Sequence, residues 1–222
     1  MSTGTDPSDF DALKDKQRRL RGGFPPSLGL RVHRALSWLG RGEAEPDDAD
    51  VRFIMLWVGF NAAYAGELIY EAVNERGAFN AFFDAMIELD VGHRIYNSVW
   101  ERFSHEIRLL LGNRYVFGPF WKHQNGVDGY ADWEERLAQS QKIIARAMAN
   151  RDTTVVLSTI FDRLYVLRNQ LVHGGATWNS SVNRDQVRDG AALLKWLLPT
   201  FIDIMMDNAT RDWGRPFYPV VD

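Results

Sequence analysis

One segment of the chain, residues 153–175, reads TTVVLSTIFDRLYVLRNQLVHGG. Its apolar side chains recur every three or four residues, which is typical of one face of an α-helix. Asn150-Arg151-Asp152 before it can cap a helix, and Gly174-Gly175 after it is a common C-terminal stop. The pattern therefore predicts a long helix over 153–173 with one face in a core. On a helical wheel this core face holds Val156, Ile160, Leu164, Leu167 and Leu171.

The opposite face of the same predicted helix is polar. It holds Asp162, Tyr165, Asn169 and His173, with Arg168 on its flank. Asn169 and His173 are four residues apart, so their side chains can meet. His173 ends the helix, where free carbonyl groups and the helix dipole favour a protonated imidazole. This face is either a functional site or an ordinary solvated surface.

The rest of the chain shows the same helical periodicity, and no run of alternating residues indicates a strand. The helix over 49–74 is apolar on more than one side, so it should lie at the centre of a bundle. The predicted fold class is therefore all-α, an antiparallel helical bundle. The helices expected around the two already named cover 27–39, 79–89, 134–149 and 183–208, with helical spacing also between 95 and 110.

Breaker residues and changes in composition divide the chain into three parts. Residues 1–26 form a polar leader, expected to be solvated and partly helical; the alternative is a basic arm that binds phosphate. Residues 27–210 form the bundle, with an insertion at about 92–132 in which the Gly-, Pro- and aromatic-rich stretch 112–130 should be a loop. Residues 211–222 form a C-terminal tail.

Composition excludes several classes of protein and of site. The chain has 222 residues, with 26 Lys and Arg against 29 Asp and Glu, and a formal net charge of −3. This balance argues against a generally basic nucleic-acid coat but allows a local basic site. Because the chain has no cysteine, disulfides, thiolate metal sites and cysteine nucleophiles are excluded. The five histidines are scattered, so neither a metal site nor a cofactor is predicted.

Hydropathy and the first residues of the chain indicate its compartment. The longest apolar run, over 53–65, is about 13 residues long, whereas a membrane-spanning helix needs about 20. The first residues are polar and acidic and lack the features of a signal peptide. We therefore expect a soluble cytoplasmic protein that has no membrane partner.

The pattern Arg168-Asn169-x-x-x-His173 is rare for a chain of this composition. With 21 Arg, 11 Asn and 5 His in 222 residues, chance predicts it about 0.02 times. Placed late in a bundle helix and followed by Gly-Gly, it resembles the signature of the HEPN superfamily. A second, weaker resemblance is to the aromatic first core helix of many members. It rests on Phe53-x-x-x-Trp57-x-x-Phe60-Asn61-x-x-Tyr64.

Together these resemblances imply a HEPN-like bundle and a metal-independent endoribonuclease that acts on RNA, as a toxin or defence effector. They imply that His173 is the general acid/base, that Arg168 binds phosphate and that Asn169 positions the reacting groups. The residue types suit this chemistry, since imidazole exchanges protons near neutral pH and guanidinium matches a charged phosphoryl group. Members that are silenced by a nucleotidyltransferase carry a tyrosine two residues after the histidine. Here that residue is Gly175, so no such antitoxin is predicted.

The spacing of the motif also favours a homodimer. On an ideal helix Arg168 and His173 point about 140° apart, so one helix presents them poorly to a single phosphate. A two-fold axis beside the polar face would line one groove with both residues from both chains. HEPN nucleases in general pair in this way, so the resemblance implies the same composite site.

Neighbouring residues have two interpretations each. Trp178 stacks on a base or caps the bundle, and Tyr165 and Asp162 line a substrate cleft or face solvent. Asn61, an amide within an apolar helix, braces the helix of the motif or bonds to neighbouring backbone. The function has alternatives too. The chain could be a non-catalytic HEPN module that binds a nucleotide or a partner, or a helical scaffold with an accidental motif.

Overall fold

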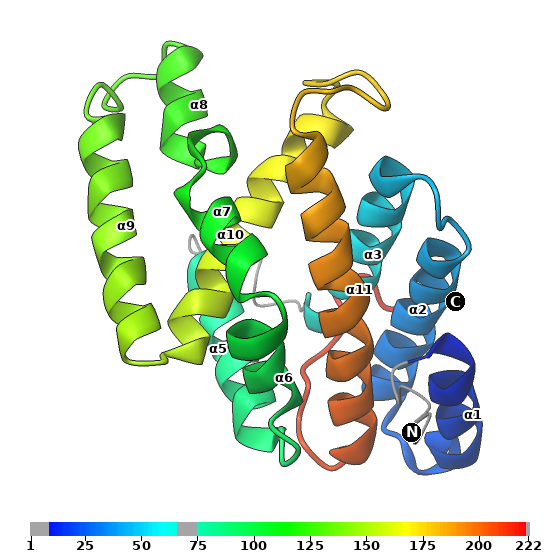
Figure 1. The fold of residues 1–222 in the computed structure, drawn as a ribbon. Helices are drawn as coiled ribbons and strands as arrows, with labels where there is room; N and C mark the ends of the chain where they lie inside the picture. Colours follow the sequence, from blue (N-terminus) through cyan, green and yellow to red (C-terminus); the bar gives the residue numbers. More distant parts are fainter. Residues whose placement is uncertain (1–8, 66–74, 221–222) are drawn as a thin grey trace, which may run out of the picture.

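The computed structural model describes residues 9–65 and 75–220, and only the backbone of 75–78. The described residues are all-α, as predicted, with no strand among them. Figure 1 shows the helices stacked side by side. Their bounds are α1 Phe10–Leu20, α2 Pro26–Glu43, α3 Ala49–Tyr64, α5 Glu75–Leu89, α6 Arg94–Asn97, α7 Ser104–Gly112, α8 Gly118–Gln124, α9 Trp133–Ala149, α10 Thr153–Val172 and α11 Arg184–Asp207. No helix of the described part is long and apolar enough to cross a membrane.

Aromatic side chains from four helices form the centre of the core. The Phe60 ring of α3 lies 4.3 Å from that of Phe161 in α10, between ring centroids. Phe83 of α5 lies 4.8 Å from Phe161, and Phe201 of α11 lies 6.3 Å from it. All four rings are fully buried, which makes this cluster the largest apolar anchor of α10.

The expected central helix, α3, begins where the sequence predicted. Asp48 precedes it, and its carboxylate accepts a hydrogen bond from the Val51 backbone N–H at 3.0 Å. Packing against α2 and α11 surrounds the helix. At Gly59 a Cβ atom would lie 2.8 Å from Leu198 Cδ2, so this glycine allows the close approach of α3 and α11. The predicted continuation over 66–74 lies outside the described residues.

The leader is partly helical, as predicted, but over Phe10–Leu20 it is not a solvated tail, and that part of the prediction is wrong. This segment is α1, which packs on α2 and α11 and buries Leu13 and Gln17. Lys16 Nζ reaches two carboxylates of α11, Asp203 at 2.5 Å and Asp207 at 2.7 Å. The many charges of this segment hide a narrow apolar face, which is enough to hold a helix against the bundle.

The C-terminal tail is held by a buried arginine. Arg31 of α2 is 1% exposed, and its guanidinium donates to the carbonyl oxygens of Ala63, Ala65, Gly214 and Arg215 at 2.8 to 3.3 Å. Burial lowers its pKa to about 10, and the charge of Asp212 partly opposes this shift. At neutral pH the charged group therefore joins the end of α3 to the tail.

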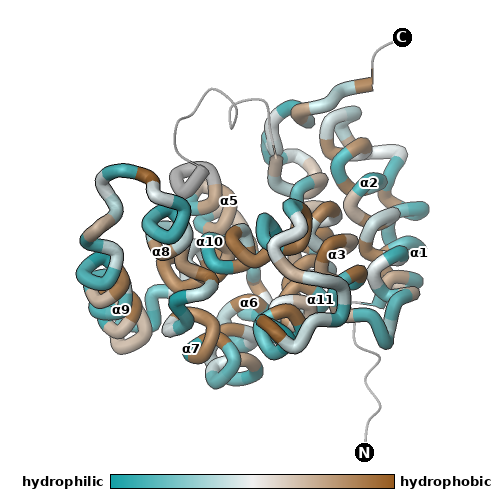
Figure 2. Tube along the Cα trace, turned by 90° about the horizontal axis from the view of Figure 1, so that it is seen from above, coloured by the Kyte–Doolittle hydropathy of each residue, from teal (hydrophilic) through white to brown (hydrophobic). Residues whose placement is uncertain are grey.

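The stretch 112–130, expected to be a loop, contains a short 3₁₀ turn and α8. Phe117 and Phe120 are buried, and the Phe120 ring meets Trp133 of α9 edge-on at 5.0 Å. Pro119 lies at the start of α8, where a proline is tolerated, so it marks a beginning and not a break. Helices α8 and α9 form a hairpin beside α10, on the side away from α1 and α2 (Figures 1 and 2).

Candidate functional site

The predicted motif helix is α10, and its ends are those expected. The Asp152 carboxylate accepts from the Val155 N–H at 3.1 Å, and His173 is the C-cap residue. Val156, Ile160, Leu164 and Leu167 are fully buried, while Leu171 is partly buried against the core. The predicted core face is therefore confirmed.

The polar face of α10 lines a large cavity that is partly open to solvent. The cavity has a volume of about 1640 Å³ and lies between α10 and the α8–α9 hairpin; we call it the α9–α10 cavity. Among the α10 side chains that line it, five polar ones form a stripe within an arc of about 80° on the helical wheel. These residues are Ser158, Asp162, Tyr165, Asn169 and His173.

Burial changes along this stripe from one end to the other. Ser158 is only 4% exposed, whereas Asp162, Tyr165 and Asn169 are half-buried and His173 is exposed. Exposure of the stripe thus rises toward His173, and we call that end the mouth of the cavity. Sequence reasoning missed Ser158, although its position four residues before Asp162 puts it on the same face.

Two of the three motif residues lie at the mouth, and the third is bonded to one of them. Arg168 Nη1 donates a hydrogen bond to Asn169 Oδ1 at 2.9 Å. The backbone N–H of His173 donates to the Asn169 carbonyl at 3.0 Å, which closes the last turn of the helix. Asn169 and His173 line the cavity, whereas Arg168 lies on the flank that the wheel predicted and does not line it. The carboxamide of Asn169 therefore connects the arginine to the cavity.

Positive charge predominates in the cavity wall. Among the described lining residues, Lys122, Arg136 and Arg163 outnumber one carboxylate, Asp162, and Arg136 also pairs with Asp132 at 2.8 Å. Arg163 is buried; its Nη2 donates to Ser140 Oγ of α9 at 3.0 Å, and its guanidinium lies 4.5 Å from the centre of the Phe117 ring. This local basic character, which the net charge of −3 permits, favours an anionic ligand.

Carboxamide groups are the most frequent polar groups of the wall, with eight Asn and Gln side chains among the described lining residues. Gln170 is structural, since its Nε2 donates to the Tyr115 carbonyl and its Oε1 accepts from Asn183 Nδ2. Four others make no side-chain hydrogen bond within the described part of the chain, so their donors and acceptors can serve a ligand. They are Asn80, Asn125, Gln139 and Gln186.

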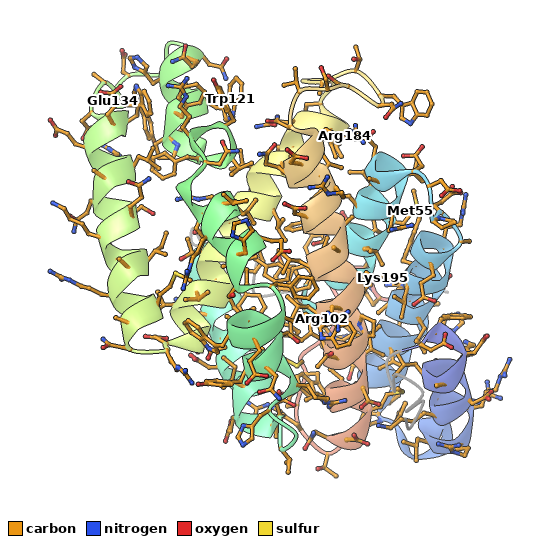
Figure 3. The ribbon with its side chains drawn as sticks, in the orientation of Figure 1. Met55, Arg102, Trp121, Glu134, Arg184 and Lys195 are labelled. Atoms are coloured by element: carbon orange, nitrogen blue, oxygen red, sulfur yellow. The ribbon has the colours of Figure 1, made fainter. Side chains whose placement is uncertain are left out.

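Trp178 does not cap the bundle. Its side chain is 73% exposed, it does not line the cavity, and its indole N–H donates to the Asp48 carboxylate at 2.8 Å. The backbone hydrogen bond from Val51 and this indole contact both lower the pKa of Asp48. The neighbouring Asp50 accepts from Arg184 Nη2 at 2.7 Å. Two carboxylates at the start of α3 therefore hold the loop between α10 and α11, with Arg184 at the upper end of α11 in Figure 3.

Asn61 does not reach the cavity either. It is partly buried in α3, its backbone carbonyl accepts from the Ala65 N–H, and it is not among the lining residues. Two aromatic side chains of α3 support the motif helix. The Phe60 ring lies 4.3 Å from Phe161, and the Trp57 ring lies 6.2 Å from Phe161 and 6.3 Å from Tyr165. Aromatic contacts thus provide the brace, which was one of the two roles that the sequence left open for Asn61.

The acidic and imidazole groups of the described residues do not gather as metal ligands would, since no three of them form a group that could hold an ion. The site therefore consists of the Arg168–Asn169–His173 mouth and a basic, carboxamide-rich cavity behind it. Comparisons with protein-family models, with curated proteins and with solved structures found no match for the chain.

Proposed function

We propose that this protein is a metal-independent endoribonuclease of the HEPN type, which cleaves RNA at the mouth of the α9–α10 cavity. One observation carries the proposal: the hydrogen-bonded pair Arg168 and Asn169 lies one turn before an exposed His173. In this proposal Arg168 binds phosphate, Asn169 positions it and His173 transfers the proton, where the exposed end of the helix gives a strand access. The excess of positive charge in the cavity wall supports an anionic substrate.

The reaction uses the 2′-hydroxyl of the substrate as nucleophile. The 2′-oxygen forms a bond to the adjacent phosphorus, the bond from phosphorus to the 5′-oxygen breaks, and the products are a 2′,3′-cyclic phosphate and a 5′-hydroxyl. A neutral His173 takes the 2′ proton, and an imidazolium gives one to the leaving oxygen. The guanidinium of Arg168 balances the negative charge that gathers on the phosphoryl oxygens.

A homodimer supplies both histidine roles at once. Two copies related by a two-fold axis beside this end of α10 bring two imidazoles and two guanidiniums to one groove. Exposed apolar side chains flank the motif: Val172 is 50% exposed, Val182 62% and Trp178 73%. These side chains are accessible to a contact between copies.

Cleavage in the presence of a chelator tests the proposal. Wild-type protein should cut total RNA in EDTA, and His173→Ala should not, while both unfold at the same temperature. His105→Ala is the matched control, because His105 is also exposed but does not line the cavity. It should cleave like the wild type.

Two results would contradict the proposal. If folded wild-type protein cuts no RNA, the carboxamide-rich cavity favours the alternative of a non-catalytic module that binds a nucleotide. If His173→Ala cuts as fast as the wild type, another group transfers the proton.

A further inference from the structure

The buried end of the α9–α10 cavity carries a hydroxyl group without a partner. Ser158 is 96% buried, and its Oγ makes no hydrogen bond to any residue that the structure describes. An unpaired buried hydroxyl destabilises the folded state. Because Ser158 lines the cavity, a group of a bound ligand can satisfy it.

Two free carboxamides reach the cavity from other helices. The Thr154 hydroxyl donates to Asp84 Oδ1 at 2.7 Å and so joins α10 to α5. Helices α5 and α10 are antiparallel. Asn80, one turn before Asp84, therefore lies level with Ser158, one turn after Thr154. On α9, Gln139 also lines the cavity, next to Ser140, whose hydroxyl accepts from Arg163 of α10.

The size of the cavity favours a segment of a polymer over a small molecule. About 1640 Å³ exceeds the roughly 300 to 1,000 Å³ of ordinary small-molecule pockets. Trp121 of α8 also lines it, and the bond from its indole N–H to the Tyr115 carbonyl fixes the ring. Figure 3 shows Trp121 near the upper end of α8. A fixed aromatic ring with free amides matches how proteins bind unpaired bases.

We infer that the α9–α10 cavity receives unpaired nucleotides of an RNA strand and reads the edge of one base with Ser158, Asn80 and Gln139. This inference rests on the proposed function, which makes RNA the strand whose backbone passes His173. The α8–α9 hairpin, of which only α8 lies within the predicted insertion 92–132, then determines which sequences are cut.

Binding of uncleavable oligonucleotides tests this inference apart from catalysis. Short 2′-O-methyl strands of A, C or U have no free 2′-hydroxyl, and a strand of the same backbone without bases shows what the phosphates contribute. Wild-type protein should bind its preferred base at least about tenfold more tightly than the abasic strand. Gln139→Leu should lower that affinity by about 5- to 100-fold, the range for one amide contact to a base edge.

Gln141→Leu is the matched control, because Gln141 lies on the same helix, is equally exposed and does not line the cavity. It should bind within about twofold of the wild type. Equal binding of base-bearing and abasic strands, equal losses in both variants, or no binding at all would overturn the inference. A free mononucleotide that binds as tightly as the strand would overturn its assignment to RNA.

Ser158→Ala separates a ligand contact from a structural role. Since the hydroxyl has no partner among the described residues, its removal should leave the melting temperature unchanged or raise it, while base-dependent binding weakens. A fall in melting temperature with unchanged binding would overturn the role of Ser158.

Cleavage of natural RNA, measured in parallel, reports on the proposed function alone. Binding without cleavage contradicts that function, and cleavage without base-dependent binding contradicts this inference.

Discussion

Asn169 Oδ1 accepts a hydrogen bond from Arg168 Nη1 at 2.9 Å, so the two side chains are joined in the free protein. This contact orients the carboxamide and leaves its two N–H groups free of the arginine, which donates to the oxygen alone. Asn169 lines the cavity and Arg168 does not, so the hydrogen bond between them holds the guanidinium next to a residue of the cavity wall.

Changing this amide to a carboxylate should disable the site without disturbing the fold. In Asn169→Asp the new charge pairs with Arg168 and repels a phosphate, so cleavage should fall by at least about tenfold. The free energy of unfolding should change by about 1 kcal/mol or less, because the residue is only half-buried. Initial rates and thermal unfolding measure both effects. Asn97→Asp, at an exposed position outside the cavity, should retain full activity, and full activity in Asn169→Asp would refute this role.

Mixed dimers test the composite site. Arg168→Ala and His173→Ala should each be inactive alone, and a mixture of the two should regain activity if one intact arginine and one intact histidine suffice. Sedimentation should show a species of twice the 25.5 kDa chain mass at micromolar concentration. A single 25.5 kDa species at that concentration would contradict a shared groove.

Glu43 near the end of α2 should make stability depend on pH. Burial, followed by the charge of Asp9, raises the pKa of its carboxyl, and Lys195 partly opposes this. The folded state therefore holds this proton more tightly than the unfolded state, and the group's contribution to stability falls as pH rises through the two pKa values. Glu43→Gln should raise the free energy of unfolding at pH 7, by less than about 1 kcal/mol. Denaturant unfolding should show that this gain disappears below about pH 4, and a gain that persists there would contradict the linkage.

Arg31 should be the most sensitive charged residue of the fold. Arg31→Ala leaves four carbonyl oxygens without their donor, and each such loss costs about 1 to 3 kcal/mol. We expect a loss of about 3 kcal/mol or more in denaturant unfolding. Arg34→Ala is the control, because Arg34 makes one exposed bond to the Tyr218 carbonyl and should cost less than about 1 kcal/mol. Similar losses for both variants would show that the buried bonds of Arg31 contribute little.

The parts of the fold that the sequence predicted are those governed by local pattern. The cap at Asp152, the core face through Leu167 and the stop at His173 all depend on neighbours along one helix. The segments predicted wrongly depend on distant contacts. The many charged residues of α1 made the apolar contact of Leu13 hard to recognise. The Gly118-Pro119 pair suggested a loop, but the segment forms α8 because Phe120 packs on Trp133 of α9.

The candidate site, too, was predictable only where it depends on the pattern of one helix. The wheel placed Asp162, Tyr165, Asn169 and His173 on one face, and all four line the cavity. The opposite wall comes from α8 and α9, so Gln139 and the contact between Arg163 and Ser140 required the tertiary structure. No spacing in the sequence relates these residues to the motif.

The ends of the RNA fragments test the central claim most directly. Wild-type protein acting in a chelator should leave fragments that end in a 2′,3′-cyclic phosphate and begin with a 5′-hydroxyl, as mass spectrometry of a defined RNA can establish. His173→Ala should release none of them. Fragments that end in a 3′-hydroxyl, or cyclic phosphates formed equally by the variant, would contradict attack by the 2′-hydroxyl with His173 as the proton-transfer group.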